Sequence, residues 1–259
     1  MDGVVDLGLL QLAASYVFVV ILLTIVKIKK ISREREILIA SIRMTLQLIV
    51  TGFILIRIFD APHPVVTVLI ITAMEIFAIA NIYKRSKMTL STKLKKIIAF
   101  SMLTGTLASL SYFLFVVVQI KPWYDPRYFI PLAGMLIGNS MTGIALGVSI
   151  LTSGMSKQRH LIEAALMLGA TPKVATKEIV NQAFDAAILP TINSMMGMGI
   201  IFLPGMMTGQ ILSGTSPLTA IEYQIAIMLG ILGSVSLCVI LFVQLGYKTF
   251  FNENSQLIQ

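Results

Sequence analysis

Charged side chains and cysteine are both scarce in this 259-residue chain. Only 12% of the residues are charged, whereas 56% are apolar, and the mean hydropathy is +0.88. A soluble domain of this size could not cover its surface with so few charges, so the lipid bilayer is the expected solvent. The single cysteine, Cys238, lies within an apolar run, which excludes an intrachain disulfide or a cysteine-based metal cluster.

The chain also lacks an ATP-binding motif of its own. No G-x-x-x-x-G-K-[ST] pattern occurs, and the dipeptide Gly-Lys is absent. Without that phosphate-binding loop and its lysine, the chain cannot hydrolyse ATP as P-loop proteins do. No metal-binding spacing of its two histidines and no Ser/His/Asp arrangement is evident, which disfavours an integral-membrane enzyme.

Long apolar runs, by contrast, are abundant. A spanning helix needs about 20 mostly apolar residues. The sequence therefore predicts an all-α polytopic membrane protein, with residues 1–259 as a single transmembrane domain and seven spans at about 7–26, 37–58, 65–83, 97–119, 129–152, 188–212 and 222–247. The first run has no basic residue and no cleavage site before Lys27, so we expect a retained span and not a signal peptide. Pro204 is expected to bend the sixth span.

The basic residues are distributed so that they orient these spans. Sixteen of the 20 Lys and Arg residues follow the first, third, fifth or seventh span. Three lie in the connections that follow the second, fourth and sixth spans, and Arg43 lies inside a span. By the positive-inside rule, the N-terminus faces outward, and the C-terminus and an insert at about 153–187 are cytoplasmic. The net charge of +8 therefore sets topology and does not indicate nucleic-acid binding. We expect a multi-pass protein of the plasma membrane, which in a bacterium is the inner membrane.

The cytoplasmic insert contains the stretch EAALMLGATPKVA (163–175). Residues 161–168 favour a helix, and Gly169 suits the left-handed position that ends one. Pro172 suits the first turn of a second helix over about 173–185. A short helix with an apolar face needs a surface on which to bury that face. Membrane lipid headgroups, the chain itself or a separate cytoplasmic protein could each provide it.

This stretch resembles the EAA-x-x-x-G loop of ABC-transporter permeases, which docks into a cleft on the ATP-binding subunit. The resemblance implies that the docking residues are Glu163, Ala164, Ala165, Leu166, Leu168 and Gly169. The importer pattern continues with Ile-x-Leu-Pro. Ile179 is in place here, but Asn181 and Gln182 occupy the Leu-Pro positions.

A narrower resemblance covers nearly the whole chain. The segments Ile42-Arg43 with Gln47-Leu48, Gly138-Asn139 with Thr142-Gly143, PTINSMM (190–196) and LPGMMTGQILSGTSPLTAIEYQI (203–225) are similar to the FetB-like (UPF0014) ABC-transporter permease family. Its bacterial members are described as iron exporters, and plant relatives are associated with aluminium tolerance. The resemblance implies a permease homodimer with two cytoplasmic ABC ATPase subunits. ATP and Mg would bind to those partners, this chain would bind no cofactor, and iron or a related metal would be exported by alternating access.

Ionisable residues inside the apolar spans mark a candidate substrate path. Arg43 and Glu75 lie roughly 9 and 12 Å from the cytoplasmic ends of their spans at the helical rise, where charge is costly and often functional. They could form a structural ion pair, or Glu75 could face a central path and offer oxygen ligands to a metal cation. Further polar side chains that could line this path are Gln47, Asn81, Asn139 and Asn193. In an alternative function, a secondary transporter, Glu75 would be the proton-coupling carboxylate.

Two patterns in these spans have both a packing explanation and a functional one. Five methionines in the predicted sixth span could be apolar filler or ligands for a soft metal; they are Met195, Met196, Met198, Met206 and Met207. Glycines four residues apart could allow close helix packing or form a seam between two copies. These pairs lie at 134/138, 143/147 and 205/209.

Overall fold

The computed structural model describes residues 7–86 and 89–258 of the chain. Within these residues the regular structure is helical, with two isolated bridges and no strand. The predicted all-α polytopic fold class is therefore confirmed. The chain divides into two compact units, one of Met1–Pro62 with Leu212–Thr215, and a larger one of His63–Ile211 with Ser216–Gln259.

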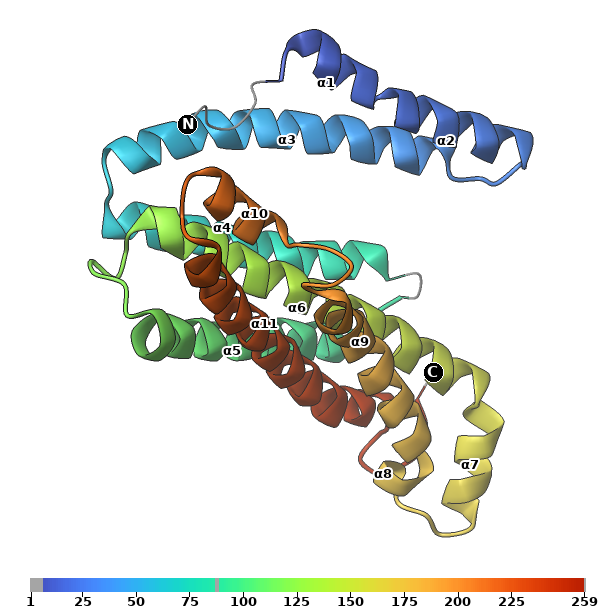
Figure 1. Cartoon of the computed structure of the whole chain (residues 1–259). Coiled ribbons are helices and arrows are strands. Elements are labelled where there is room, and N and C mark those ends of the chain that lie inside the picture. The colour runs from blue at the N-terminus through green and yellow to red at the C-terminus, as the bar shows by residue number, and fades with distance from the viewer. Residues whose placement is uncertain (1–6, 87–88, 259) are drawn as a thin grey trace. The chain divides into compact units, whose positions relative to one another are not determined.

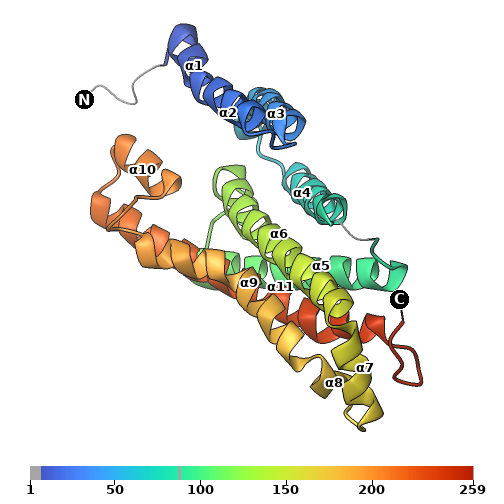
Figure 2. The same cartoon turned by 90° about the vertical axis from the view of Figure 1, so that its right-hand side faces the viewer.

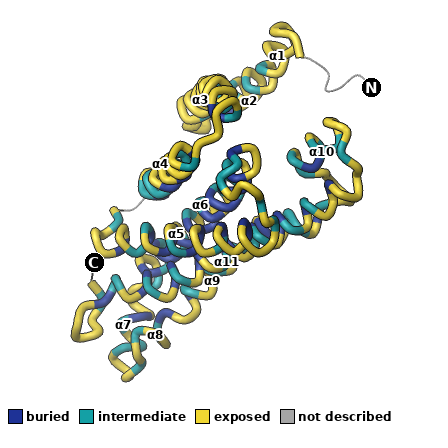
Figure 3. Tube along the Cα trace, turned by 90° about the vertical axis from the view of Figure 1, so that its left-hand side faces the viewer, coloured by how far each residue is buried: buried dark blue, intermediate teal, exposed yellow. Residues whose placement is uncertain are grey.

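The N-terminal unit is a helical hairpin. α1 (Leu9–Ser15) and α2 (Val17–Ile28) follow each other with only Tyr16 between them, and α3 (Glu34–Asp60) runs back beside α2 (Figure 1). The Tyr16 and Thr45 hydroxyls are hydrogen-bonded across the hairpin. Most residues of these helices are exposed (Figure 3), so the hairpin presents a large apolar surface.

Five long helices make up the body of the larger unit. They are α4 (Pro64–Arg85), α5 (Thr92–Tyr112), α6 (Pro126–Lys157), α9 (Lys177–Gly197) and α11 (Pro217–Gly246). α5 continues into a π-helical turn, η1 (Phe113–Val118), and α11 into a short 3-10 helix, η2 (Tyr247–Phe250). The short helices are α7 (Arg159–Met167), α8 (Pro172–Ala175) and α10 (Gly205–Leu212).

The core lies where α5, α6, α9 and α11 meet, and glycine allows their close approach. A Cβ on Gly143 would lie 2.9 Å from the Val235 side chain and 3.3 Å from the Ala187 carbonyl oxygen, and one on Gly147 would contact Ala187 and Phe242. This glycine pair therefore serves helix packing, as one of the two interpretations expected. Among the other paired glycines, Gly138, Gly205 and Gly209 have open space where a Cβ would lie.

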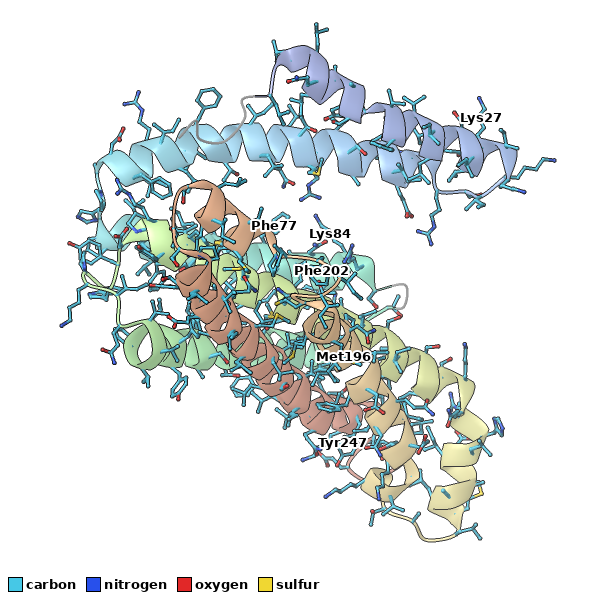
Figure 4. All side chains as sticks on the ribbon, in the orientation of Figure 1. Lys27, Phe77, Lys84, Met196, Phe202 and Tyr247 are labelled. Atoms are coloured by element: carbon cyan, nitrogen blue, oxygen red, sulfur yellow. The ribbon has the colours of Figure 1, made fainter. Side chains whose placement is uncertain are left out.

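Six segments of the described chain are long and apolar enough to span a bilayer, and they correspond to six of the seven predicted spans. The remaining prediction, one helix over 188–212, is wrong, because α9 ends at Gly197 and α10 begins at Gly205. Gly199 has φ +82° and its N–H donates to the Phe202 carbonyl (3.0 Å), which makes a turn. Figure 4 shows Met196 and Phe202 at this turn. Pro204 thus follows a break and does not bend a continuous helix.

The broken segment still connects opposite ends of the larger unit. Ile179 packs against Gly154 near the end of α6, and Ala187 packs against Gly143 nearer its middle, so α9 runs antiparallel to α6. Met198, after α9, lies beside Gln224 in the first turns of α11. α11 then returns toward the end that carries α7 and α8 (Figure 2). The path of the chain through α9 and the turn after it therefore agrees with a membrane crossing at the predicted sixth span.

Candidate functional site

The helix that was predicted to dock exists, and its end has the expected geometry. α7 follows α6 after one residue, Gln158. Gly169 has φ +89° and donates its N–H to the Leu166 carbonyl, while Ala170 donates to the Ala165 carbonyl, both at 3.0 Å. These two bonds form the Schellman arrangement, in which a left-handed residue lets the last carbonyls of a helix be satisfied. Gly169 therefore reverses the chain at the tip of the insert.

One side of α7 is anchored and its tip is exposed. Ile162 is buried, and Leu166 packs partly against the core. Met167 and Leu168 are 86% and 89% exposed, and Leu161 is also exposed. The chain thus holds α7 through Ile162 and Leu166 and leaves two apolar side chains without cover at the tip.

The second helix of the insert differs from the prediction. A helix was expected over about 173–185, but α8 is a single turn and α9 begins at Lys177. The backbone turns at Thr176, whose hydroxyl donates back to the Pro172 carbonyl (2.8 Å). Such a side-chain bond offers the backbone an alternative to a regular helix. α9 then continues through Pro190, so the rest of the expected insert helix and the start of the expected sixth span are one element.

A C-terminal hairpin that was not predicted lies beside α7. Residues 250–258 fold back on themselves around Asn252, whose N–H donates to the Gln256 carbonyl (2.9 Å) and whose side-chain oxygen accepts the Gln256 N–H (2.8 Å). Phe251 is buried and Leu257 packs against the core, which anchors the hairpin. The turn residues Asn-Glu-Asn-Ser were a local signal for a turn, but they carry no information about the surface on which it packs.

A groove of about 580 Å³ separates α7 from this hairpin. Its lining consists of Glu163, Leu166, Met167, Ala170, Asn254, Ser255, Gln256 and Leu257. The Arg159 Nε donates to Glu163 Oε1 at 2.8 Å, which fixes the carboxylate one helical turn from its partner. The α7 wall is largely apolar, and the hairpin wall is largely polar.

Glu75, on α4, is enclosed inside the larger unit at 2% exposure. Its Oε1 is hydrogen-bonded to the Thr106 hydroxyl on α5, and its Oε2 has no hydrogen-bond partner. The Cys238 thiol on α11 lies close to Glu75 and to Ser140 and Ser234, whose hydroxyls are 2.9 Å apart. Four helices therefore contribute polar groups to one buried cluster. A charged acidic side chain at the bilayer centre costs about 2.5–3.5 kcal/mol on insertion scales.

The other residues of the predicted path do not share this enclosure. Asn139 and Asn193 are exposed, and Asn139 donates to a carbonyl of its own helix. Arg43 and Gln47 belong to α3 of the N-terminal unit. The Arg43–Glu75 ion pair and the convergence of these side chains on one path stay predictions.

Residues 7–86 and 89–258 contain no group of three or more His, Cys, Asp or Glu side chains placed to hold a metal ion. Two thioethers instead accept weak hydrogen bonds from amides. Asn81 donates to Met141 Sδ (3.4 Å), and Gln224 donates to Met198 Sδ (3.7 Å). Of the five methionines in the predicted sixth span, Met198 has such a contact, whereas Met196 is 76% exposed. The packing and soft-metal interpretations of these methionines, and coordination by Glu75, stay predictions.

Comparison with known proteins places the chain in a family. Residues 9–251 match the family described as "Uncharacterised protein family (UPF0014)". The chain belongs to the UPF0014 family. A UPF0014 relative, "UPF0014 membrane protein YjkA" of Bacillus subtilis (strain 168), is 36% identical over 255 residues, which cover 96% of this chain and 98% of the relative. The predicted family and the integral-membrane class are thus confirmed.

Two other UPF0014 relatives have names that refer to metals. "Probable iron export permease protein FetB" of Escherichia coli (strain K12) is 33% identical over 249 residues, covering 96% of this chain and 94% of the relative. "Protein ALUMINUM SENSITIVE 3" of Arabidopsis thaliana is 34% identical over 250 residues, covering 96% and 90%. No solved structure matches the chain.

Proposed function

We propose that this chain is the permease subunit of an ATP-driven ABC exporter and that the tip of α7 inserts into a separate cytoplasmic ATPase subunit. The carrying observation is a helix fixed through Ile162 whose tip leaves Met167 and Leu168 almost fully exposed. Exposed apolar side chains at a fixed position mark an interaction surface. The C-terminal hairpin extends this surface on the other side of the groove. The partner supplies the P-loop, ATP and Mg.

The connections of α7 explain how such a partner would drive transport. α6 joins α7 through one residue, Gln158, and α9 leaves the insert directly after Thr176. Gly154 on α6 packs against Ile179 on α9 at this same end. A displacement of α7 therefore moves the ends of α6 and α9 together. Closure of the ATPase on ATP is thereby converted into alternating access in a permease homodimer.

The proposed orientation is supported by the distribution of charge in the fold. The insert carries Lys157, Arg159, Lys173 and Lys177, and Lys248 lies at the end of α11, next to the hairpin that packs beside α7. Basic residues that gather at one end favour the cytoplasmic side. This supports a cytoplasmic α7, an outward N-terminus and a cytoplasmic C-terminus, in the inner membrane of a bacterium.

The proposed substrate class is based on similarity to a relative and not on a metal site in the structure. The name of the Escherichia coli relative refers to iron export, and its similarity to this chain extends over nearly its whole length. We assign iron or a related metal species as the exported substrate.

Leu168→Asp tests the docking proposal, with Leu168→Met as its matched control. The aspartate places a charge in the partner's cleft, whereas methionine keeps the apolar contact. Leu168 is 89% exposed, so neither change disturbs the core. We expect Leu168→Asp to lose at least tenfold in ATPase co-purification and in ATP-driven metal export from vesicles, while Leu168→Met retains both. Equal co-purification by the two folded variants would refute docking through α7.

The enclosure of Glu75 favours a second candidate, a proton-coupled secondary transporter. Proteoliposomes separate the two functions. The exporter requires the ATPase and ATP, whereas a secondary transporter would move metal with this chain alone under a pH gradient.

A further inference from the structure

The hydrogen bonds around Glu75 fit a carboxylic acid better than a carboxylate. A carboxylate has four lone-pair sites and no donor, and a protonated carboxyl has one donor. Glu75 is enclosed, yet one of its oxygens has no partner and the other has only the Thr106 hydroxyl. A buried carboxylate with one neutral partner would be left largely uncompensated.

The hydroxyl hydrogen of Thr106 already has an acceptor, the Met102 carbonyl. The Thr106 hydroxyl lies 2.7 Å from the Met102 carbonyl, one helical turn earlier, as well as in contact with Glu75 Oε1. A hydroxyl has a single hydrogen and cannot donate a full hydrogen bond to both oxygens. If that hydrogen binds the Met102 carbonyl, which is only an acceptor, the contact with Glu75 requires a hydrogen from the carboxyl group.

The contacts described around Glu75 involve neutral groups. The Thr106 hydroxyl on α5 contacts the carboxyl group, and the Cys238 thiol on α11, which lies beside Ser140 and Ser234, is close enough to interact with it. Hydroxyl and thiol groups can donate or accept hydrogen bonds and carry no positive charge. These groups therefore suit a neutral acid and supply no counter-ion.

We propose that Glu75 is a proton-binding site, held in this conformation as a neutral acid that donates to Thr106 Oγ1 while Thr106 donates to the Met102 carbonyl. Its role in transport rests on the proposed function. Because Glu75 is 2% exposed in this conformation, the carboxyl group can exchange its proton only when the site opens to water.

Infrared spectroscopy of the purified chain in lipid nanodiscs at neutral pH tests protonation without any ATPase. The expected wild-type spectrum contains the carbonyl band of a protonated carboxylic acid, which shifts in D2O and is absent in Glu75→Gln. Glu222→Gln is the control, because Glu222 is an exposed acidic residue of α11 and its replacement should leave the band unchanged. Loss of docking by α7 would not alter this result, so the two proposals fail separately.

Thr106 variants give a second measurement that keeps Glu75 in place. Thr106→Val removes the acceptor, so the carbonyl band should move to the position of a carboxyl without a hydrogen bond. Thr106→Ser keeps the hydroxyl and should leave the band where it is. The proposal is overturned if the folded wild type differs from Glu75→Gln only in carboxylate bands, as an ion pair with Arg43 would produce, or if Thr106→Val and Thr106→Ser give the same band.

Discussion

At the scale of single residues, Gly105 on α5 lies closely against Cys238 on α11. A Cβ on Gly105 would lie 2.8 Å from the backbone nitrogen of Cys238 and 2.9 Å from its Cα. Backbone atoms of a packed helix cannot withdraw as the end of a flexible side chain can. Any larger residue at this position therefore has to separate the two helices, next to the buried cluster around Glu75.

Gly105→Ala is expected to lower the free energy of unfolding by about 1–3 kcal/mol, the usual cost of overpacking a core. Gly138→Ala is the matched change, because Gly138 also lies within a helix and has open space where its Cβ would be. Gly138→Ala should leave the free energy of unfolding unchanged or raise it by up to about 1 kcal/mol, because alanine favours a helix more than glycine does. Thermal unfolding in detergent compares the two. Equal melting temperatures would show that α5 and α11 are not in such close contact.

At the scale of elements, the tip of α7 depends on the left-handed backbone of Gly169. A Cβ on Gly169 would have open space around it, so backbone strain, and not a steric clash, decides which residues this position tolerates. A β-branched residue is strongly disfavoured at positive φ, whereas asparagine adopts it more readily. Gly169→Val should therefore displace Met167 and Leu168 and weaken ATPase co-purification, while Gly169→Asn should preserve it. Native co-purification by Gly169→Val would contradict the role of this turn.

The elements also show which features the sequence could predict. α7 and its glycine-terminated end were predictable, because helix propensity and the left-handed turn are local properties. The break between α9 and α10 was not, because residues 198–204 are as apolar as the helices around them and only Gly199 and Pro204 mark a turn. The pairing of Glu75 with Thr106 joins residues on different helices and leaves no local signal.

At the scale of the whole molecule, the insert and the C-terminal hairpin lie at the same end of the larger unit. The C-terminal hairpin lines the same groove as α7. Between them, α9 with the turn after it and α11 form a departing and a returning segment. This agrees with the prediction from the basic residues that the insert and the C-terminus share one side of the membrane.

Site-directed crosslinking in native membranes tests the central claim, that α7 contacts an ATPase, most directly. Cys238 is the single cysteine and lies beside Ser140 and Ser234, so Cys238→Ser provides a background without thiols. In that background, Leu168→Cys carrying a photoreactive maleimide should crosslink to a polypeptide with a P-loop sequence, identified by mass spectrometry. Asp125→Cys, placed before α6 at its opposite end, should not. A Leu168→Cys that crosslinks only to lipid, while metal export still depends on ATP, would contradict the account.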